Sequence, residues 1–309
     1  MSTRNAPSNQ FEMQAAKPAP RSRAIAFSLG VLVVTLVSVA AEAQEVAATS
    51  RSAGMGEAMT AGVSGTSALW HNPAGISSAI MYSAEAGYYY DSQSGTNGVT
   101  ANVIDTKSNP DLGAGLAFTY ETASPKDGPG YEAYHVKGGF AIPLVDGLVK
   151  MGGGVRYTTA SLDGKNVVEA LTADAGIMVQ PLESLSIGVA GLNLVNGGYE
   201  EEMPSLLSIG LALGSLRYGF YLGGDVLFNL SAEVPEEART WRAGAEYLAG
   251  EAFPLRAGFQ YDELVDEKTV TVGAGFRDSA TAIGFDASYQ HNLDNKAERV
   301  FIGSLSAYF

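Results

Sequence analysis

The chain has 309 residues, contains no cysteine and carries a formal net charge of −14. The lack of cysteine excludes disulfides, thiolate metal sites and a cysteine nucleophile. The acidic balance argues against nucleic acid as a partner, because a phosphate backbone attracts basic surfaces.

Residues 1–43 predict a signal peptide for export. Four basic residues precede an apolar stretch from Ala24 to Val39, and Ala41-Glu42-Ala43 fits the small-x-small cleavage pattern. The apolar stretch is shorter than the roughly 20 residues of a membrane-spanning helix, so a retained anchor is the weaker alternative. We expect removal near Ala43, with Met1 or Met13 as the start of translation. Residues 1–43 hold four basic and two acidic residues, so the remainder carries −16.

Residues 44–79 are rich in alanine, glycine and serine and lack any two-residue alternation. The Asn72-Pro73 step moves Asn72 out of the helical region, and asparagine side chains cap turns. Gly54, Gly56 and Gly75 permit close backbone approach or a positive φ. Two roles fit these residues: a turn held against a wall, or a gate.

From residue 80 to residue 309 the dominant pattern has a period of two, the side-chain period of a β-strand. Leu112, Leu116 and Phe118, for example, alternate with small or polar residues. The even count and the usual run length are typical of strands that cross an outer membrane. We predict fourteen strands, near residues 80–91, 98–106, 111–122, 131–142, 147–159, 167–179, 184–193, 205–213, 216–229, 239–249, 253–262, 268–277, 281–290 and 298–309.

The spacing between these strands also favours a membrane barrel. Predicted outer loops (122–130, 193–204, 230–238, 263–267 and 291–297) are mostly longer than the inner turns (143–146, 214–215 and 278–280). A soluble β-sandwich also alternates, but aromatic residues such as Tyr88, Tyr157 and Tyr247 cluster near strand ends, as in a membrane girdle. The last strand ends at Phe309, the terminal aromatic residue that outer-membrane barrels present to their assembly machinery.

If the apolar face meets lipid, the opposite face lines a lumen. The acidic residues predicted there are Glu85, Glu121, Asp174, Asp225, Glu246 and Asp286, and the basic ones are Lys137, Arg156, Arg217, Arg242, Arg256 and Arg277. Their near balance predicts mutual pairing, not a selectivity ring of one sign. A structural network is the simpler interpretation. We expect Arg242, Glu246, Arg256 and Asp286 to contact residues 44–79.

Catalytic and metal chemistry is not expected. The three histidines are His71 in the N-terminal segment, His135 on the predicted lumen face and His291 at a loop edge. No Gly-x-Ser-x-Gly or His-Glu-x-x-His motif accompanies them, and the acidic outer loops lack the spacing of a calcium loop. No cofactor is predicted.

Two short stretches carry a family resemblance. Gly54-Met55-Gly56 and Asn72-Pro73-Ala74-Gly75 resemble the N-terminal plug of FadL-type hydrophobic-compound transporters and their PorV-like relatives. The stretches 191–194, 203–204, 244–247 and 255–259 resemble the PorV-like branch. The resemblance implies a fourteen-stranded antiparallel barrel (residues 80–309) with residues 44–79 folded into the lumen as a hatch, and these seven motif residues as parts of the gate.

Three functions remain open from the sequence. The FadL-type resemblance implies plug-gated passage of small hydrophobic molecules that leave sideways through the wall. The PorV-like resemblance implies service to a secretion system, with an exported protein as partner. The short outer loops, which leave little room for capturing a substrate, point toward this second function, but passage of small hydrophobic molecules is the function that we predict. A sealed structural barrel, with outer-membrane lipid as its surroundings, is the third.

Overall fold

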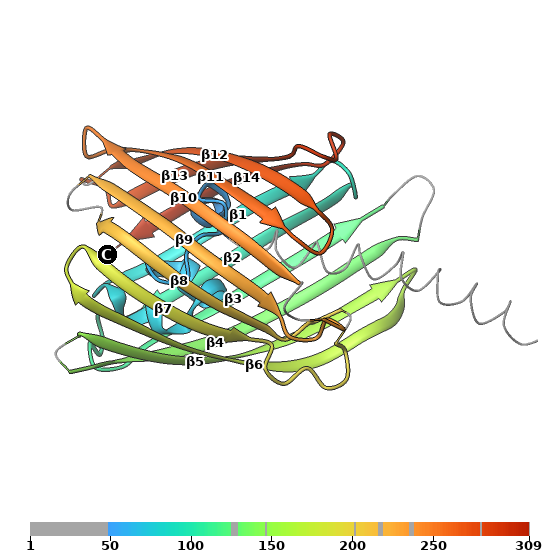
Figure 1. Cartoon of the computed structure of the whole chain (residues 1–309), viewed down its shortest axis with the longest axis horizontal. Helices are drawn as coiled ribbons and strands as arrows, with labels where there is room; N and C mark the ends of the chain where they lie inside the picture. The colour runs from blue at the N-terminus through green and yellow to red at the C-terminus, as the bar shows by residue number, and fades with distance from the viewer. Residues whose placement is uncertain are drawn as a thin grey trace, which may run out of the picture. The chain divides into compact units, whose positions relative to one another are not determined.

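Fourteen antiparallel strands close into one barrel in the computed structural model (Figure 1). The structure describes residues 49–124, 129–145, 147–200, 202–215, 219–234, 238–278 and 280–308. The predicted all-β antiparallel barrel is confirmed. The predicted signal peptide (residues 1–43), Arg217 and Phe309 lie outside the described residues.

Each predicted strand has a counterpart in the barrel. The strands are β1 (Tyr82–Asp91), β2 (Thr96–Asp105), β3 (Gly113–Ala123), β4 (Tyr131–Leu144), β5 (Val149–Leu162), β6 (Lys165–Leu182), β7 (Leu185–Leu192), β8 (Leu206–Ser215), β9 (Phe220–Asn229), β10 (Arg239–Ala249), β11 (Phe253–Asp262), β12 (Glu267–Asp278), β13 (Ile283–Asn292) and β14 (Arg299–Tyr308). Neighbours in sequence pair with each other, and β14 pairs with β1 to close the ring.

The largest errors in the predicted boundaries lie at β5, β6 and β9. Strands β5 and β6 run on to a two-residue turn, Asp163-Gly164, in which both residues have positive φ. This Asp-Gly turn matches the twist of a hairpin, so pairing continues to the turn itself. Strand β9 begins at Phe220, four residues later than predicted.

The two faces of the wall differ as the alternation predicts. Large apolar side chains such as Leu116, Val272 and Leu305 point outward and are exposed. Residues on the opposite face, such as Thr119 and Glu121, are fully buried. The outward face therefore has the apolar character of a surface that meets lipid.

We call the rim where β1 starts and β14 ends the lower rim, and the opposite rim the upper rim. Most lower-rim connections are short, as between β6 and β7 (183–184), and upper-rim connections include the longer segments 193–205 and 230–238. Two connections depart from the predicted alternation: the β5–β6 turn (163–164) is short at the upper rim, and 106–112 is long at the lower rim.

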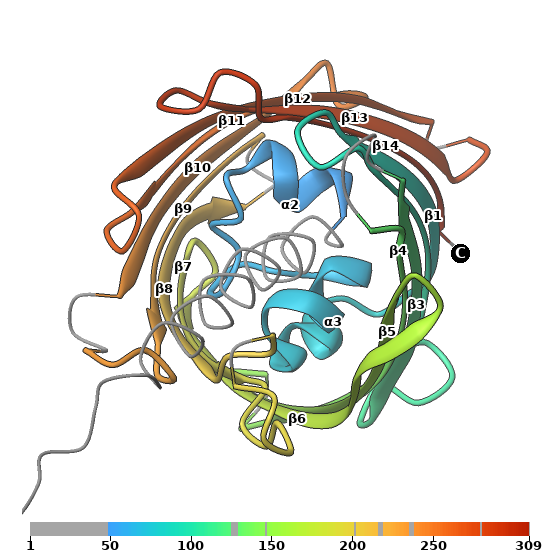
Figure 2. The ribbon, with the colours of Figure 1, turned by 90° about the vertical axis from the view of Figure 1, so that its right-hand side faces the viewer.

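Residues 49–79 lie inside the ring and are called the lumenal segment (Figure 2). The segment contains α2 (Ser50–Gly54), α3 (Ala68–His71) and two 3-10 helices, η1 (Gly65–Ser67) and η2 (Pro73–Ser78). Thr49 caps α2, because its hydroxyl accepts a hydrogen bond from the backbone N–H of Ser52 at 3.3 Å. Among the described residues, no helix is long and apolar enough to cross a membrane.

The hydrophobic core of the protein lies between the lumenal segment and the wall. Met55, Leu69 and Ile76 of the segment are at most 1% exposed, and they cluster with Ile104 and Met178 of the wall. Because a side chain of this size contributes about 1.5–3 kcal/mol when buried, such contacts hold the segment in place.

Candidate functional site

The lumenal segment rests on a belt of glycines. One glycine from each of eight consecutive strands, β5 to β12, faces the segment: Gly152, Gly176, Gly188, Gly210, Gly223, Gly244, Gly258 and Gly273. We call these eight residues the glycine belt. Several are direct cross-strand partners, including Gly152 with Gly176, Gly188 with Gly210, and Gly244 with both Gly223 and Gly258.

The glycine belt lets the segment's backbone touch the wall. A Cβ atom at Gly244 would lie 2.1 Å from the carbonyl oxygen of Met55, and one at Gly188 would lie 2.3 Å from that of Thr60. Atoms at those distances overlap, so any larger residue would displace the segment. Because these eight positions have no side chains, the glycine belt forms a surface on which the backbone of the lumenal segment can pack.

The Gly54-Met55-Gly56 motif packs against the glycine belt. Gly56 has a φ of +61°, and a Cβ there would lie 2.8 Å from the backbone nitrogen of Phe259. Both the left-handed conformation and the close approach require glycine. The carbonyl oxygen of Gly54 accepts a hydrogen bond from the hydroxyl of Thr271 at 3.1 Å, which ties the motif to β12.

The Asn72-Pro73-Ala74-Gly75 motif forms the second contact with the belt. Asn72 Oδ1 accepts a hydrogen bond from the backbone N–H of Ala74 at 3.1 Å, and its Nδ2 donates to the carbonyl oxygen of Thr60 at 2.8 Å. Asn72 thus caps η2 and joins the two halves of the segment. Pro73 rests on Gly152, and Gly75 packs against Val63 inside the segment.

A chain of buried charges connects the segment to the wall. Arg51 Nε donates to Glu246 Oε2 at 2.9 Å, and Arg256 Nε donates to the same oxygen at 2.7 Å. Arg256 Nη1 also donates to Asp286 Oδ1 at 2.5 Å. The four side chains carry no net charge, which keeps the cost of their burial low.

Other predicted lumen charges contact the lumenal segment or the wall. Asp225 accepts a hydrogen bond from the backbone N–H of Thr60 at 2.8 Å, and Glu85 accepts one from the hydroxyl of Thr66. Arg242 is buried on the lumen side of β10, and Arg156 donates to Asn193 Oδ1. Glu246, Glu85 and Asp225 thus each accept a hydrogen bond from the lumenal segment.

Two contributors were not singled out from the sequence. Arg51 is the one lysine or arginine between residues 44 and 79, and an isolated cation opposite acidic lumen residues was a usable signal. The glycine belt was also visible, because each of these eight strands has a glycine on its polar face. Its meaning depended on knowing which strands the segment would cross.

The upper end of the lumen has an apolar lining. Ala133, Ala160 and Val168 on neighbouring strands cluster with Tyr131 and with Met203, which is 2% exposed. Met203 belongs to the β7–β8 connection, so this connection folds inward over the mouth. The base of the connection is fixed at Asn193, whose backbone N–H donates to Asp174 Oδ1 at 2.8 Å.

The wall is thin where β3, β4 and β5 pass the segment. Gly115 pairs with Gly139, and Gly139 with Gly154, so the lumen face has no side chains there. A Cβ at Gly139 would lie 3.1 Å from both Leu69 Cδ2 and Ile76 Cδ1. Only backbone therefore separates these two side chains from the outside of the barrel.

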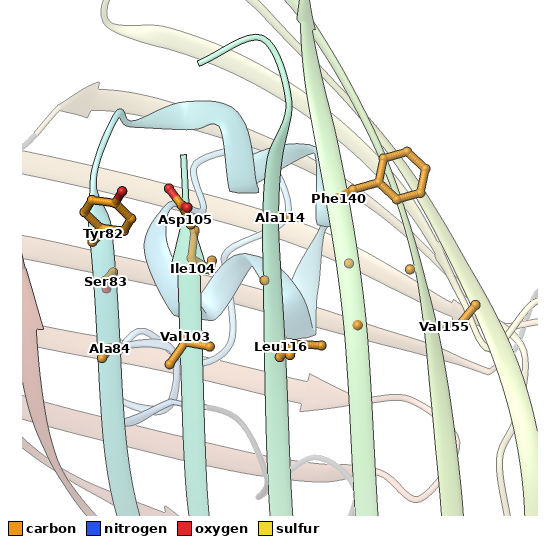
Figure 3. Close-up of a pocket in the computed structure, with 14 residues that line it drawn as sticks. Tyr82, Ser83, Ala84, Val103, Ile104, Asp105, Ala114, Leu116, Phe140 and Val155 are labelled. Carbon is orange, nitrogen blue, oxygen red and sulfur yellow. The ribbon is translucent and has the colours of Figure 1, made fainter. Parts of the chain in front are cut away.

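A trough of about 790 Å³ lies on the outside of the same stretch of wall (Figure 3). Val103, Leu116, Phe140 and Val155 stand around it, and Ala114 and Gly138 leave space between them. Its lining is apolar, so a small hydrophobic molecule from the membrane would fit it. Among the described residues, no group of three or more histidine, aspartate or glutamate side chains is placed to hold a metal ion.

Comparison with protein-family models gives no match, and comparison with curated proteins gives none. Solved structures do match. The CymD monoaromatic hydrocarbon channel aligns with a TM-score of 0.64 at 12% identity, over 85% of this chain and 97% of that one. The Ralstonia pickettii toluene transporter TbuX aligns with 0.61 at 12% identity (84% and 98%), and a Pseudomonas aeruginosa FadL homologue with 0.54 at 14% identity (85% and 98%). At these identities the likeness shows the fold: this chain has the fold of FadL-type hydrophobic-compound channels.

Proposed function

We propose that this chain is an outer-membrane channel for small hydrophobic molecules and that the lumenal segment is its gate. The observation that carries the proposal is the glycine-lined wall at Gly115, Gly139 and Gly154, with apolar side chains of the segment on one side and an apolar trough on the other. Movement of Leu69 and Ile76 away from this wall would open an apolar route through the lumen beside it.

The shared fold supports the same class of cargo. Two of the proteins that align with this chain over almost their whole length are named as a hydrocarbon channel and a toluene transporter. In this proposal the chain is exported with its signal peptide, cleaved near Ala43, and assembled into the outer membrane through the strand that ends at Phe309. The lumenal segment then closes the barrel at rest.

A reversible disulfide tests the gate. The hydroxyl oxygens of Thr60 and Ser208 lie 2.6 Å apart, one on the segment and one on β8, and the chain has no cysteine of its own. Thr60→Cys with Ser208→Cys should lock the segment when oxidised. We expect cells with the oxidised barrel to lose barrel-dependent uptake of radiolabelled toluene, and a reductant to restore it.

Each single-cysteine variant serves as the matched control, because neither can form the lock. Uptake that continues through the oxidised double variant would contradict the gating role of the segment. If cells that carry the unmodified barrel take up no more toluene than cells without it, the channel function itself is contradicted.

An accessory role in protein secretion is the second candidate. Several connections at the upper rim carry exposed apolar residues: Val195 is 62% exposed, and Leu264 and Val265 are each 60% exposed. Exposed apolar residues at loop tips are common where another protein binds. A photo-crosslinking residue at position 264 or 265 should then capture an exported protein in the cell, and position 195 provides a second probe.

A further inference from the structure

A band of polar side chains crosses the lumen face of β1 to β4 just below the apolar mouth. Thr119 on β3 pairs with His135 on β4, and Glu121 lies one inward position above Thr119. Tyr89 on β1 covers Gly98 on β2, which is the cross-strand partner of Glu121. All four polar side chains are less than 7% exposed.

These polar groups are only partly satisfied: Tyr131 donates to Glu121 Oε2 at 3.5 Å, and His135 Nδ1 lies 3.0 Å from Thr158 Oγ1. Within the described part of the chain, Tyr89 Oη, Thr119 Oγ1, Glu121 Oε1 and His135 Nε2 make no hydrogen bond. His135 Nε2 and Glu121 Oε1 are 3.7 Å apart, which is too far for a hydrogen bond. More than nine in ten buried polar groups are satisfied in folded proteins, so several orphans on adjacent strands indicate a place for a ligand.

The surroundings of the band determine what kind of ligand fits. Beside Glu121 lies its cross-strand partner Ala133, and Ala160 and Val168 continue the same row on β5 and β6, so together they offer an apolar lining. The charged side chains buried along this stretch of lumen include Asp91, Glu121, Lys137, Arg156 and Asp174, and these five sum to −1. Lys137 forms an ion pair with Asp174. An anionic head group would add to this negative charge, whereas a neutral head group adds none.

We infer that the channel takes amphiphiles with a neutral hydroxyl head, such as alkylphenols, and that Glu121 and Thr119 bind this hydroxyl. The hydroxyl proton is donated to Glu121 Oε1, and the hydroxyl oxygen accepts from Thr119 or Tyr89. The alkyl part lies against the apolar lining near Ala133 and Val168. This inference rests on the proposed function and narrows its cargo.

The test compares two molecules that differ in one hydroxyl. Equilibrium dialysis of radiolabelled 4-propylphenol and propylbenzene against the detergent-purified barrel measures both affinities at one micelle concentration. An apolar lumen would prefer propylbenzene, which has the larger apolar surface. A lumen built to bind a hydroxyl should prefer 4-propylphenol by about tenfold or more, because the analogue leaves its polar groups unpaired.

Two variants assign the effect to the band. Thr119→Val preserves the shape of the side chain and should lower the phenol-to-hydrocarbon affinity ratio roughly fivefold, the value of one hydrogen bond. Glu121→Gln still accepts from the hydroxyl but loses the charge that strengthens the bond, so it should lower the ratio by a smaller factor. Thr172→Val is the matched control, because Thr172 is an equally buried lumen residue on β6. Its ratio should equal that of the unmodified barrel. If either band variant fails to assemble, the other and Tyr89→Phe provide the same readout.

The outcomes separate the two proposals. Equal affinity for both molecules, or a ratio that no band variant changes, would overturn the hydroxyl inference while the channel function stands. Binding of neither molecule, together with no barrel-dependent uptake of toluene, would remove the proposed function as well. A preference for 4-propylphenol that Thr119→Val and Glu121→Gln both reduce would support the inference.

Discussion

Arg51 in the lumenal segment donates a hydrogen bond to Glu246 in β10 at 2.9 Å, across 195 positions of sequence. The same carboxylate oxygen accepts a hydrogen bond from Arg256, so Glu246 stays paired when either arginine is removed. The hydrogen bond between Arg51 and Glu246 therefore acts as a latch: it holds the lumenal segment to the wall, and its loss does not leave Glu246 unpaired.

Replacing Arg51 with methionine should loosen the segment and leave the barrel intact. Glu246 retains Arg256, so the cost should be about 1.5–3 kcal/mol, the value of a hydrogen bond to a charged group, and not the larger cost of an unpaired buried charge. Hydrogen exchange in peptides from residues 49–79 should accelerate about tenfold or more. Unchanged exchange in Arg51→Met would contradict the latch.

The glycine belt predicts a position-specific intolerance. Gly244→Ala places a methyl group 2.1 Å from the carbonyl oxygen of Met55 and should cost the docked segment about 1–3 kcal/mol. Protease should then cut within residues 49–79. Gly138→Ala is the control, because a Cβ there points outward and its nearest neighbour, Leu116 Cδ2, is 3.5 Å away. Equal protease resistance in both variants would argue against the belt.

Asn72 needs both ends of its amide group. Asn72→Asp keeps the acceptor for the N–H of Ala74 but removes the donor to the carbonyl oxygen of Thr60. It also buries a new charge, so we expect it to destabilise the docked segment more than Asn72→Ala, which should cost about 1–3 kcal/mol. Hydrogen exchange in peptides from residues 49–79 measures how far each variant destabilises the segment. A larger effect of Asn72→Ala than of Asn72→Asp would disprove the role of the donor.

The sequence alone predicts the barrel, but it does not predict which wall residues the lumenal segment packs against. Period-two alternation is a local property, so residues such as Leu116 and Val272 could be assigned to the outer face without any structure. The alternation also placed Glu246, Arg256 and Asp286 on one face. Their mutual contacts depend on the register between strands β10 to β13, which alternation does not determine.

The lumenal segment was harder to predict for a different reason. Its helices are short, and their side chains contact strands that are far away in sequence, as Arg51 does with Glu246 and Gly54 with Gly273. Local composition indicated turns and close backbone approach. The identity of the wall residues that face each turn is a tertiary property.

The outward face should tolerate charge near the lower rim and not at mid-height. Val272 lies near the centre of β12 and is 54% exposed, whereas Leu144 is the last residue of β4. Val272→Arg should reduce the unfolding free energy in lipid by about 2–4 kcal/mol, and Leu144→Arg by about 0–1 kcal/mol. Denaturant titration in vesicles measures both. Equal costs would mean that Val272 does not face hydrocarbon.

One loop carboxyl predicts a pH dependence. Burial raises the pKa of Glu298, in the β13–β14 connection, and the nearby carboxylates of Glu267 and Asp91 raise it further against the opposing hydrogen bond from Asn292. The folded protein thus binds this proton more tightly than the unfolded chain. The resulting stability is complete below the unfolded pKa of about 4.5 and is lost as pH rises through the folded value.

Glu298→Gln isolates this contribution, because glutamine still accepts from Asn292 and does not ionise. The variant should unfold at a higher temperature than the unmodified protein at neutral pH, and the difference should vanish in acid below the unfolded pKa. Thermal unfolding in detergent at both conditions measures it. A difference that does not depend on pH would contradict the titration of Glu298.

The glycine belt also has a consequence for the order of assembly. Its eight residues come from eight strands, and they form one surface only after those strands have paired. Residues 49–79 are made before every strand that they touch, yet they have no complete surface to dock on until the sheet is in register. The part of the barrel that is synthesised first must therefore wait, and it enters its place last.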